Sequence, residues 1–239
     1  MTSDPTAVFA PAARVRGTLA LIVGRDETAA VYHRFGTRIS ADGYTVAVFE
    51  DADAVAATAW LSEQADTPRV LVGSDTGASI VLTALAQGDV ADAAIVAGIV
   101  VDTDHAPTDA ERTACPVHLG VLAEQHATTS SAAADFSDAV STVRLPDPAD
   151  LAAISVPVLA VHGGADPVSP LSQALAVLGA IPDVDVFETV DGLHDALNDQ
   201  THRSVAASIV LWLERLRAGD VHTPILRPAA SRSEIGARA

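Results

Sequence analysis

Short apolar runs alternate with helical patterns along most of this chain, and that alternation limits the folds open to it. Apolar runs of strand length occupy 17–24, 44–49, 69–73, 93–101, 156–162 and 184–190. Helical patterns occupy 27–42, 54–64, 78–87, 171–178 and 204–217. Strands that alternate with helices form right-handed βαβ units, because parallel neighbours need a long crossover. The sequence therefore predicts an α/β protein with a mostly parallel, doubly wound sheet.

Length and composition fit one domain followed by a short tail. The 239 residues are 49% hydrophobic, enough to bury a sizeable core. We predict a single domain over 1–217 and a mobile tail over 218–239, which is rich in proline, alanine, serine and arginine. Within the domain, 103–150 shows no long helix pattern and contains a strand-like run at 115–122. We interpret 103–150 as a reduced lid region.

The charge balance excludes several classes of partner. Acidic residues outnumber basic ones by 31 to 14, for a net charge of −17, which disfavours nucleic acids and anionic membrane surfaces. The chain has no lysine, which excludes a Schiff-base or P-loop lysine. The single cysteine, Cys115, allows no intrachain disulfide, and we find neither a signal peptide nor an apolar run of membrane-spanning length. We expect a cytoplasmic protein that acts on a small molecule.

The most informative segment is 70–78, in which an apolar strand leads into Gly73, Asp75 and Gly77 and then into a helix. A Gly-x-Ser-x-Gly motif in this context forms a nucleophile elbow, a sharp turn that exposes its central side chain above the sheet. The helix that follows supplies a backbone N–H and a favourable dipole for developing negative charge. The motif here is Gly-x-Asp-x-Gly, so Asp75 occupies the central position.

Three other segments join this one in a resemblance that covers about 17–217. These segments are similar to motifs of the α/β-hydrolases, in particular the monoacylglycerol lipase and lysophospholipase branch. They are Gly24-Arg25-Asp26-Glu27 with Tyr32 and Phe35, the run 156–170, and the run 192–199. The four segments follow the order of that family, each at a predicted strand end. The resemblance implies the α/β-hydrolase fold with a short or absent cap, and hydrolase activity.

The resemblance also implies roles for individual residues. Asp75 stands at the nucleophile position, Asp166 at that of the orienting acid, and His194 at that of the base. The backbone N–H groups of Arg25 and Thr76 stand at the oxyanion hole. Neither a cofactor nor a metal is expected, because no dinucleotide-binding fingerprint and no metal-ligand spacing occur.

The aspartate departs from the lipase pattern, which has serine at the elbow. Haloalkane dehalogenases and epoxide hydrolases do use an elbow aspartate, whose carboxylate attacks carbon to form an ester that water then hydrolyses. Few of the residues that assist the aspartate in those families occur here. Thr76 follows Asp75 where dehalogenases have a halide-binding tryptophan. Epoxide hydrolases use cap tyrosines to protonate the epoxide, and this chain has only Tyr32 and Tyr44. Asp75 therefore favours chemistry at saturated carbon on a small or medium apolar substrate, or a site without activity.

Several alternatives stay open. Ser74 is the rival nucleophile of a serine esterase, and Asp75 is also suited to cap the next helix. Glu124 competes with Asp166 as the acid, and a non-catalytic member of the fold would keep the pocket for binding. The sequence does not determine the oligomeric state, and a homo-oligomer is compatible with it. Apart from His194, we interpret the histidines as structural or exposed: His33, His105, His118, His126, His162, His202 and His222.

Overall fold

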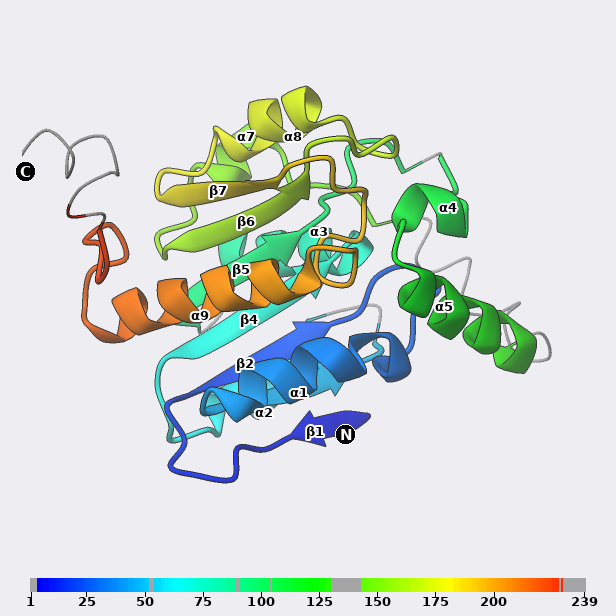
Figure 1. The fold of residues 1–239 in the computed structure, drawn as a ribbon. Coiled ribbons are helices and arrows are strands. Elements are labelled where there is room, and N and C mark those ends of the chain that lie inside the picture. Colours follow the sequence, from blue (N-terminus) through cyan, green and yellow to red (C-terminus); the bar gives the residue numbers. More distant parts are fainter. Residues whose placement is uncertain are drawn as a thin grey trace, which may run out of the picture.

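The computed structural model describes residues 4–51, 54–88, 91–103, 105–129, 143–227 and 229. In these residues seven strands form one sheet in the order β1-β3-β2-β4-β5-β6-β7 (Figure 1). The strands are β1 Ala7–Phe9, β2 Gly17–Ile22, β3 Tyr44–Phe49, β4 Arg69–Ser74, β5 Ala93–Ala97, β6 Val158–Gly163 and β7 Val184–Thr189. All neighbours are parallel except β1, which runs antiparallel to β3. The predicted doubly wound, mostly parallel sheet is confirmed, and the antiparallel edge strand β1 is an addition to it.

Helices cover both faces of the sheet. One face packs against α1 (His33–Ala41) and α9 (His202–Arg217). The other packs against α2 (Val55–Ser62), α3 (Thr76–Ala86), α7 (Pro148–Leu151) and α8 (Leu171–Leu178). This arrangement confirms the helical patterns found between the strands, apart from small shifts at their ends.

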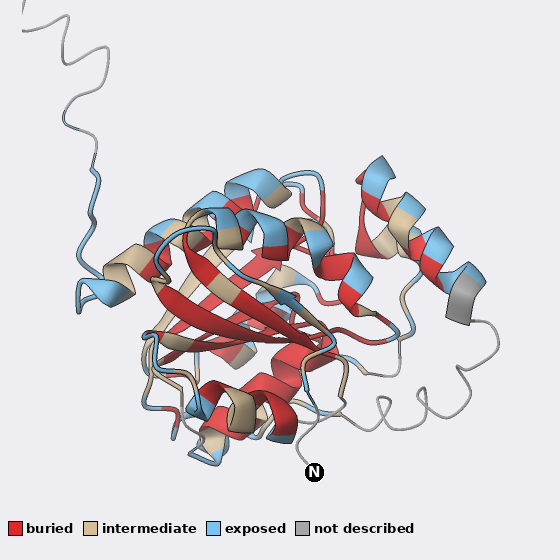
Figure 2. Cartoon of the chain, turned by 90° about the horizontal axis from the view of Figure 1, so that it is seen from below, coloured by how far each residue is buried: buried red, intermediate tan, exposed pale blue. Residues whose placement is uncertain are grey.

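Each central strand contributes to two cores, because successive side chains in a strand point to opposite faces. In β2, Leu19 and Leu21 join the core beneath α1 and α9, whereas Ala20 and Ile22 join the core on the opposite face. All four are fully buried, and Figure 2 shows the central strands as a mostly buried layer between the helices. Burial on both faces explains why these strands are continuous apolar runs.

The segment at 115–122 corrects the sequence prediction. It is not a strand: α5 (Pro116–Thr129) begins there, and it supplies the long helix that the sequence did not reveal in 103–150. β5 pairs directly with β6, so the sheet has no place for a strand between them. The side chains that α5 buries, His118, Leu122 and Gln125, are four and three positions apart on one helix face. Valine and leucine gave the run a strand-like composition, but tertiary packing stabilises it as a helix.

Two short elements complete the fold near the strand ends. η1 (Ala29–Tyr32) precedes α1, and α4 (Asp109–Arg112) precedes α5. Figure 1 shows α4 and α5 beyond the carboxyl ends of the central strands; both helices belong to 103–150, the segment that we interpreted as a reduced lid region. Among the described residues, no helix is long and apolar enough to cross a bilayer.

The predicted tail begins in the described part of the chain. Val221 is buried, and His222 contacts the Asp183 carboxylate at 3.0 Å. Residue 228 and residues 230–239, half of the predicted tail, lie outside the described residues, and the prediction of a mobile tail stays untested.

Candidate active site

Asp75 occupies a strained turn between β4 and α3. Its φ of 52° and ψ of −122° lie in a region that residues other than glycine rarely adopt, at a cost of about 1–3 kcal/mol. Its N–H donates to the Ala97 carbonyl at 3.0 Å, which ties the turn to the neighbouring strand. The Asp75 side chain makes no capping hydrogen bond, so helix capping does not explain it. This geometry is that of an elbow presenting its side chain at the strand ends.

The two glycines of the motif allow the elbow to form. A Cβ atom on Gly73 would lie 2.3 Å from the carbonyl oxygen of Gly77, and one on Gly77 would lie 2.4 Å from the carbonyl oxygen of Ile22. Both separations are well inside van der Waals contact with backbone atoms that cannot move freely. The spacing Gly-x-Asp-x-Gly is therefore a steric requirement of strand, turn and helix packed this closely.

His194 and Asp166 form a buried pair at the ends of two neighbouring strands. Asp166 follows β6 and His194 follows β7, and His194 Nδ1 lies 2.7 Å from Asp166 Oδ2. The other oxygen, Asp166 Oδ1, accepts the N–H groups of Val168 and Ser169 at 2.8 and 3.0 Å. The rival acid, Glu124, is exposed on α5, so the geometry pairs His194 with Asp166.

Charges around this pair oppose the effect of burial. Burial disfavours the Asp166 carboxylate, but hydrogen bonds from His162 and His194 outweigh it and hold the pKa of Asp166 well below its usual value. Burial also disfavours a charged His194, yet the hydrogen bond to Asp166 and the nearby negative charge of Asp75 raise the pKa of His194. His194 Nε2, the nitrogen that does not face Asp166, is buried and has no hydrogen-bond partner among the described residues.

Two arginines hold the Asp75 carboxylate. Arg25 Nη2 lies 3.2 Å from Asp75 Oδ1 and Arg25 Nε lies 3.4 Å from Oδ2. Arg112 Nη1 is 3.9 Å from Oδ2. Arg25 and Arg112 are 8% and 6% exposed and Asp75 is 3% exposed, so these ion pairs are largely shielded from water. The sequence suggested an oxyanion-hole role for the backbone N–H of Arg25, but it did not reveal the contacts of the Arg25 and Arg112 side chains with Asp75.

Arg112 also binds the segment that carries Arg25. Its Nη1 lies 3.1 Å from Glu27 Oε1, and its Nη2 donates to the Arg25 carbonyl at 3.1 Å. The second Glu27 oxygen accepts the Gly24 N–H at 3.1 Å and the Tyr32 hydroxyl. Burial, reinforced by the negative charge of Asp195, raises the pKa of Glu27 to about 7 despite the nearby Arg112. Glu27 thus locks the turn after β2 that places Arg25 beside Asp75.

The His194 loop positions Arg112. The N–H of Asp195 donates to the Arg112 carbonyl at 2.8 Å, and the N–H of His194 donates to the Glu111 carbonyl at 3.4 Å. These backbone bonds join α4 to the loop after β7. The segment 103–150 therefore contributes a charged side chain, Arg112, to the site.

The remaining predicted residues lie around the same turn. Within the described part of the chain, the N–H groups of Arg25 and Thr76 make no hydrogen bond, as donors of an oxyanion hole require before substrate binds. His194 Nε2 has no hydrogen-bond partner among the described residues, so Ser74 is not activated by His194 in this structure. Among the described residues, no group of three His, Cys, Asp or Glu side chains is placed to bind a metal ion.

Two residues of the site escaped sequence analysis for different reasons. Arg112 lies in a segment without a recognisable pattern, so nothing local marks it. His162, interpreted as structural or exposed, is buried, with its Nε2 2.7 Å from the Ser169 carbonyl and 3.2 Å from Asp166 Oδ2. Its place at the end of β6, four residues before Asp166, was a signal that could have associated it with the acid.

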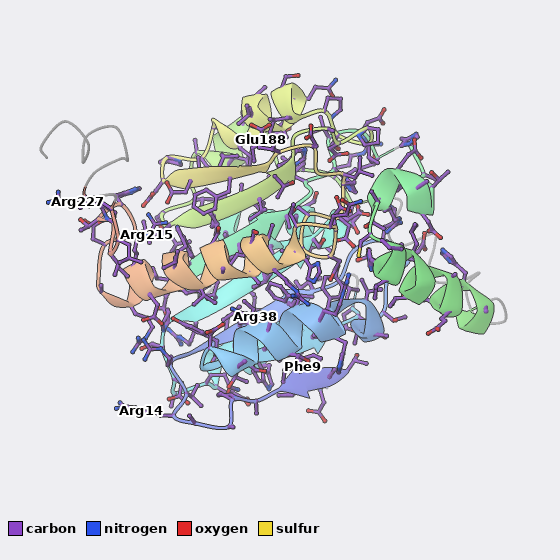
Figure 3. All side chains as sticks on the ribbon, viewed as in Figure 1. Phe9, Arg14, Arg38, Glu188, Arg215 and Arg227 are labelled. Carbon is purple, nitrogen blue, oxygen red and sulfur yellow. The ribbon has the colours of Figure 1, made fainter. Side chains whose placement is uncertain are left out.

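The arginines that Figure 3 labels lie elsewhere on the molecule. Arg38 is on α1 with a side chain that is 54% exposed, and Arg227 projects near the end of the described chain. Arg25 and Arg112 differ because they are buried at the strand ends, next to a carboxylate. Since desolvating a guanidinium is costly, two such residues at one place mark a specialised site.

Comparisons with known proteins agree on the fold. No family model matches the chain, and no curated protein is significantly similar to it in sequence. A monoacylglycerol lipase from Paleococcus ferrophilus has 14% identity and a TM-score of 0.64, over 87% of this chain and 96% of that one. A putative non-heme bromoperoxidase from Mycobacterium tuberculosis has 13% identity and a TM-score of 0.68, over 88% and 95%. A bromoperoxidase from Bacillus anthracis has 17% identity and a TM-score of 0.65, over 84% and 93%. The chain therefore has the α/β-hydrolase fold, as predicted.

Proposed function

We propose that this chain is a hydrolase in which Asp75 attacks a saturated carbon, His194 activates water, and Asp166 orients His194. The observation that carries the proposal is the combination of an elbow carboxylate with an unbonded His194 Nε2. A serine nucleophile must pass its proton to a histidine, and so requires a hydrogen bond to it. A carboxylate needs no such transfer before it attacks. Nε2 is then left to bind the water of the second step.

The reaction balances in two steps. The Asp75 carboxylate displaces a leaving group X⁻ from R–X and forms an alkyl ester, with the C–X bond broken and a C–O bond formed. His194 then takes a proton from water, and the resulting hydroxide attacks the ester carbonyl. The products are R–OH and the regenerated carboxylate, and the proton leaves through His194. The N–H groups of Arg25 and Thr76 would stabilise the oxyanion formed during ester hydrolysis.

The electrostatics favour this order of events. The negative charge of Asp75 helps to raise the pKa of His194 in the resting site. Once Asp75 is an ester, that charge is gone and the pKa of His194 falls. His194 therefore becomes a better base in the intermediate, when water has to be deprotonated.

Trapping the ester tests the proposal. In His194→Gln, the first step proceeds and the second is blocked, so the ester should accumulate. Intact mass spectrometry should show the protein heavier by R minus one hydrogen for a halide, or by the whole substrate for an epoxide, and peptide mapping should place the adduct on Asp75. The control is the double variant with Asp75→Asn, which should stay unmodified. Haloalkanes, 2-halo acids and epoxides form the substrate panel.

Other outcomes would overturn the proposal in distinct ways. A serine esterase would react with a fluorophosphonate probe at Ser74 and lose its activity in Ser74→Ala, whereas we expect neither. Absence of an adduct and of Asp75-dependent turnover with the whole panel would favour a non-catalytic member of the fold.

A further inference from the structure

We propose that the substrate of this site carries a carboxylate next to the carbon that Asp75 attacks, and that Arg25 and Arg112 bind this group. The inference rests on the proposed function, because it names the class of substrate for the same nucleophile. It also changes the sequence-based expectation of an apolar substrate, since two buried guanidinium groups suit an anion.

Three buried polar atoms at the site have no hydrogen-bond partner among the described residues. They are Arg25 Nη2, Asp75 Oδ1 and His194 Nε2. The first two face each other at 3.2 Å as an ion pair, but without the geometry of a hydrogen bond. Buried polar atoms in proteins are nearly always hydrogen-bonded. Two of the atoms belong to the Arg25–Asp75 ion pair, and the third belongs to His194, whose pKa the charge of Asp75 raises. Together they indicate a place for a ligand that has both a polar group for Arg25 and a reacting centre for Asp75.

The charges decide which sign this ligand carries. In the resting site Asp75 is the counter-ion of Arg25, while Glu27 and Asp75 share Arg112. Formation of the ester neutralises Asp75 and leaves Arg25 without a counter-ion. An unpaired buried charge is strongly destabilising. A substrate carboxylate replaces the lost negative charge, whereas a neutral substrate does not.

The same ion pair explains how an anion would promote attack. Arg25 and Arg112 restrain the Asp75 carboxylate and withdraw electron density from it. A guanidinium offers several donors in a planar fork that matches the geometry of oxyanions such as carboxylates. A substrate carboxylate that competes for Arg25 would release Asp75 at the moment when the reactive carbon arrives. Asp75 would then attack substrates that carry a carboxylate and react poorly with neutral electrophiles.

Geometry limits how far the anion lies from the reactive carbon. Because Arg25 Nη2 is only 3.2 Å from Asp75 Oδ1, a group held by Arg25 brings the adjacent carbon to Asp75. Acids substituted at carbon 2 meet this condition. With 2-bromopropionate, Asp75 would displace bromide from carbon 2, and water would then hydrolyse the ester to 2-hydroxypropionate and the free carboxylate.

A matched pair of substrates tests the inference. 2-Bromopropionate and 2-bromopropionamide have the same carbon skeleton and leaving group and differ in charge, and bromide release measures both. We expect kcat/KM at least 10-fold higher for the acid in the parent protein, and loss of this preference in Arg25→Gln. Arg112→Gln should reduce the preference, and Arg38→Gln, on an exposed α1 residue, should leave it unchanged. Equal use of both substrates by the parent protein, or an undiminished preference in Arg25→Gln, overturns the inference.

Binding of an unreactive acid separates this inference from the proposed function. In Asp75→Asn the competing carboxylate is absent, so calorimetry should detect binding of propionate. Binding should weaken when Arg25→Lys is added, because lysine keeps the positive charge but lacks the paired donors of a guanidinium. An Asp75 adduct with the amide but no preference for the acid overturns only the anion site. Propionate binding with no adduct from either compound overturns only the nucleophile. Failure of both binding and adduct formation overturns both.

Discussion

Replacing Glu27 with glutamine should make the protein relatively more stable as the pH rises. Burial raises the pKa of Glu27 from its ordinary value near 4.5 to about 7 in the folded protein. The folded state therefore holds a proton that the unfolded state releases, and the parent protein loses stability as pH rises from about 4.5 through 7. Glu27→Gln keeps the shape and removes this titration.

The size of the effect follows from the pKa difference. One unit corresponds to about 1.4 kcal/mol, so between pH 5 and pH 8 the ionisation of Glu27 costs about 2–3 kcal/mol. The free energy of unfolding of Glu27→Gln, relative to that of the parent protein, should therefore rise by about this amount over the same interval. Any constant difference from altered hydrogen bonds with Arg112 cancels in the comparison between the two pH values.

Urea unfolding of both proteins at pH 5 and pH 8 measures this double difference. Titrating groups that do not interact with Glu27 are common to both proteins and cancel. His118 is an exception, because the charge of Glu27 helps to raise its pKa. Glu63→Gln, at an exposed position after α2, is the matched control and should differ equally from the parent at both pH values. A double difference for Glu27→Gln below about 0.5 kcal/mol, or of opposite sign, would refute the argument that desolvation dominates at Glu27.

Three further predictions concern the elbow, the acid and the core. Asp166→Asn should lower the pKa of His194, because the hydrogen bond and the charge that raise it are lost; NMR titration of the imidazole would contradict this if the midpoint did not move. Gly77→Ala should cost about 1–3 kcal/mol of stability or prevent folding, because the added Cβ would lie 2.4 Å from a backbone oxygen. Gly120→Ala, in α5 with open space around it, should instead stabilise the protein by about 0.5–1 kcal/mol. Thermal unfolding measures both, and similar shifts for the two variants would be inconsistent with a steric role of Gly77. Tyr44→Phe should cost about 1–2 kcal/mol in urea unfolding, because its hydroxyl donates to a carboxylate of α9 at 2.6 Å, and an unchanged midpoint would show that this bond contributes nothing.

Local patterns in the sequence were sufficient for the sheet and for the elbow. Apolar runs buried on both faces gave the parallel strands, and the glycines flanking Asp75 gave the strand, turn and helix. The order of four motifs also brought Asp166 and His194 to adjacent strand ends, where the structure pairs them at 2.7 Å. Such features are accessible because strand burial and tight turns depend on residues close together in the chain.

Composition indicates the wrong element where packing overrides local preference. The run at 115–122 has the composition of a strand, yet most of it forms the first part of α5. β5 pairs directly with β6 and leaves no place for a strand between them, whereas a helix buries His118 and Leu122 on one face. Short apolar runs do not distinguish a buried strand from a buried helix.

The electrostatics of the site depended entirely on the tertiary structure. Arg25 and Asp75 are 50 positions apart, and Arg112 and Glu27 are 85 apart, so no period or spacing relates them. Their contacts arise because the parallel strands end at one edge of the sheet, where loops distant in sequence meet. The sequence by itself determined which residue occupies the elbow. Only the folded chain decided that the carboxylate of this residue lies between two buried guanidinium groups, because long-range charge pairing depends on distance in space and leaves no local pattern in the sequence.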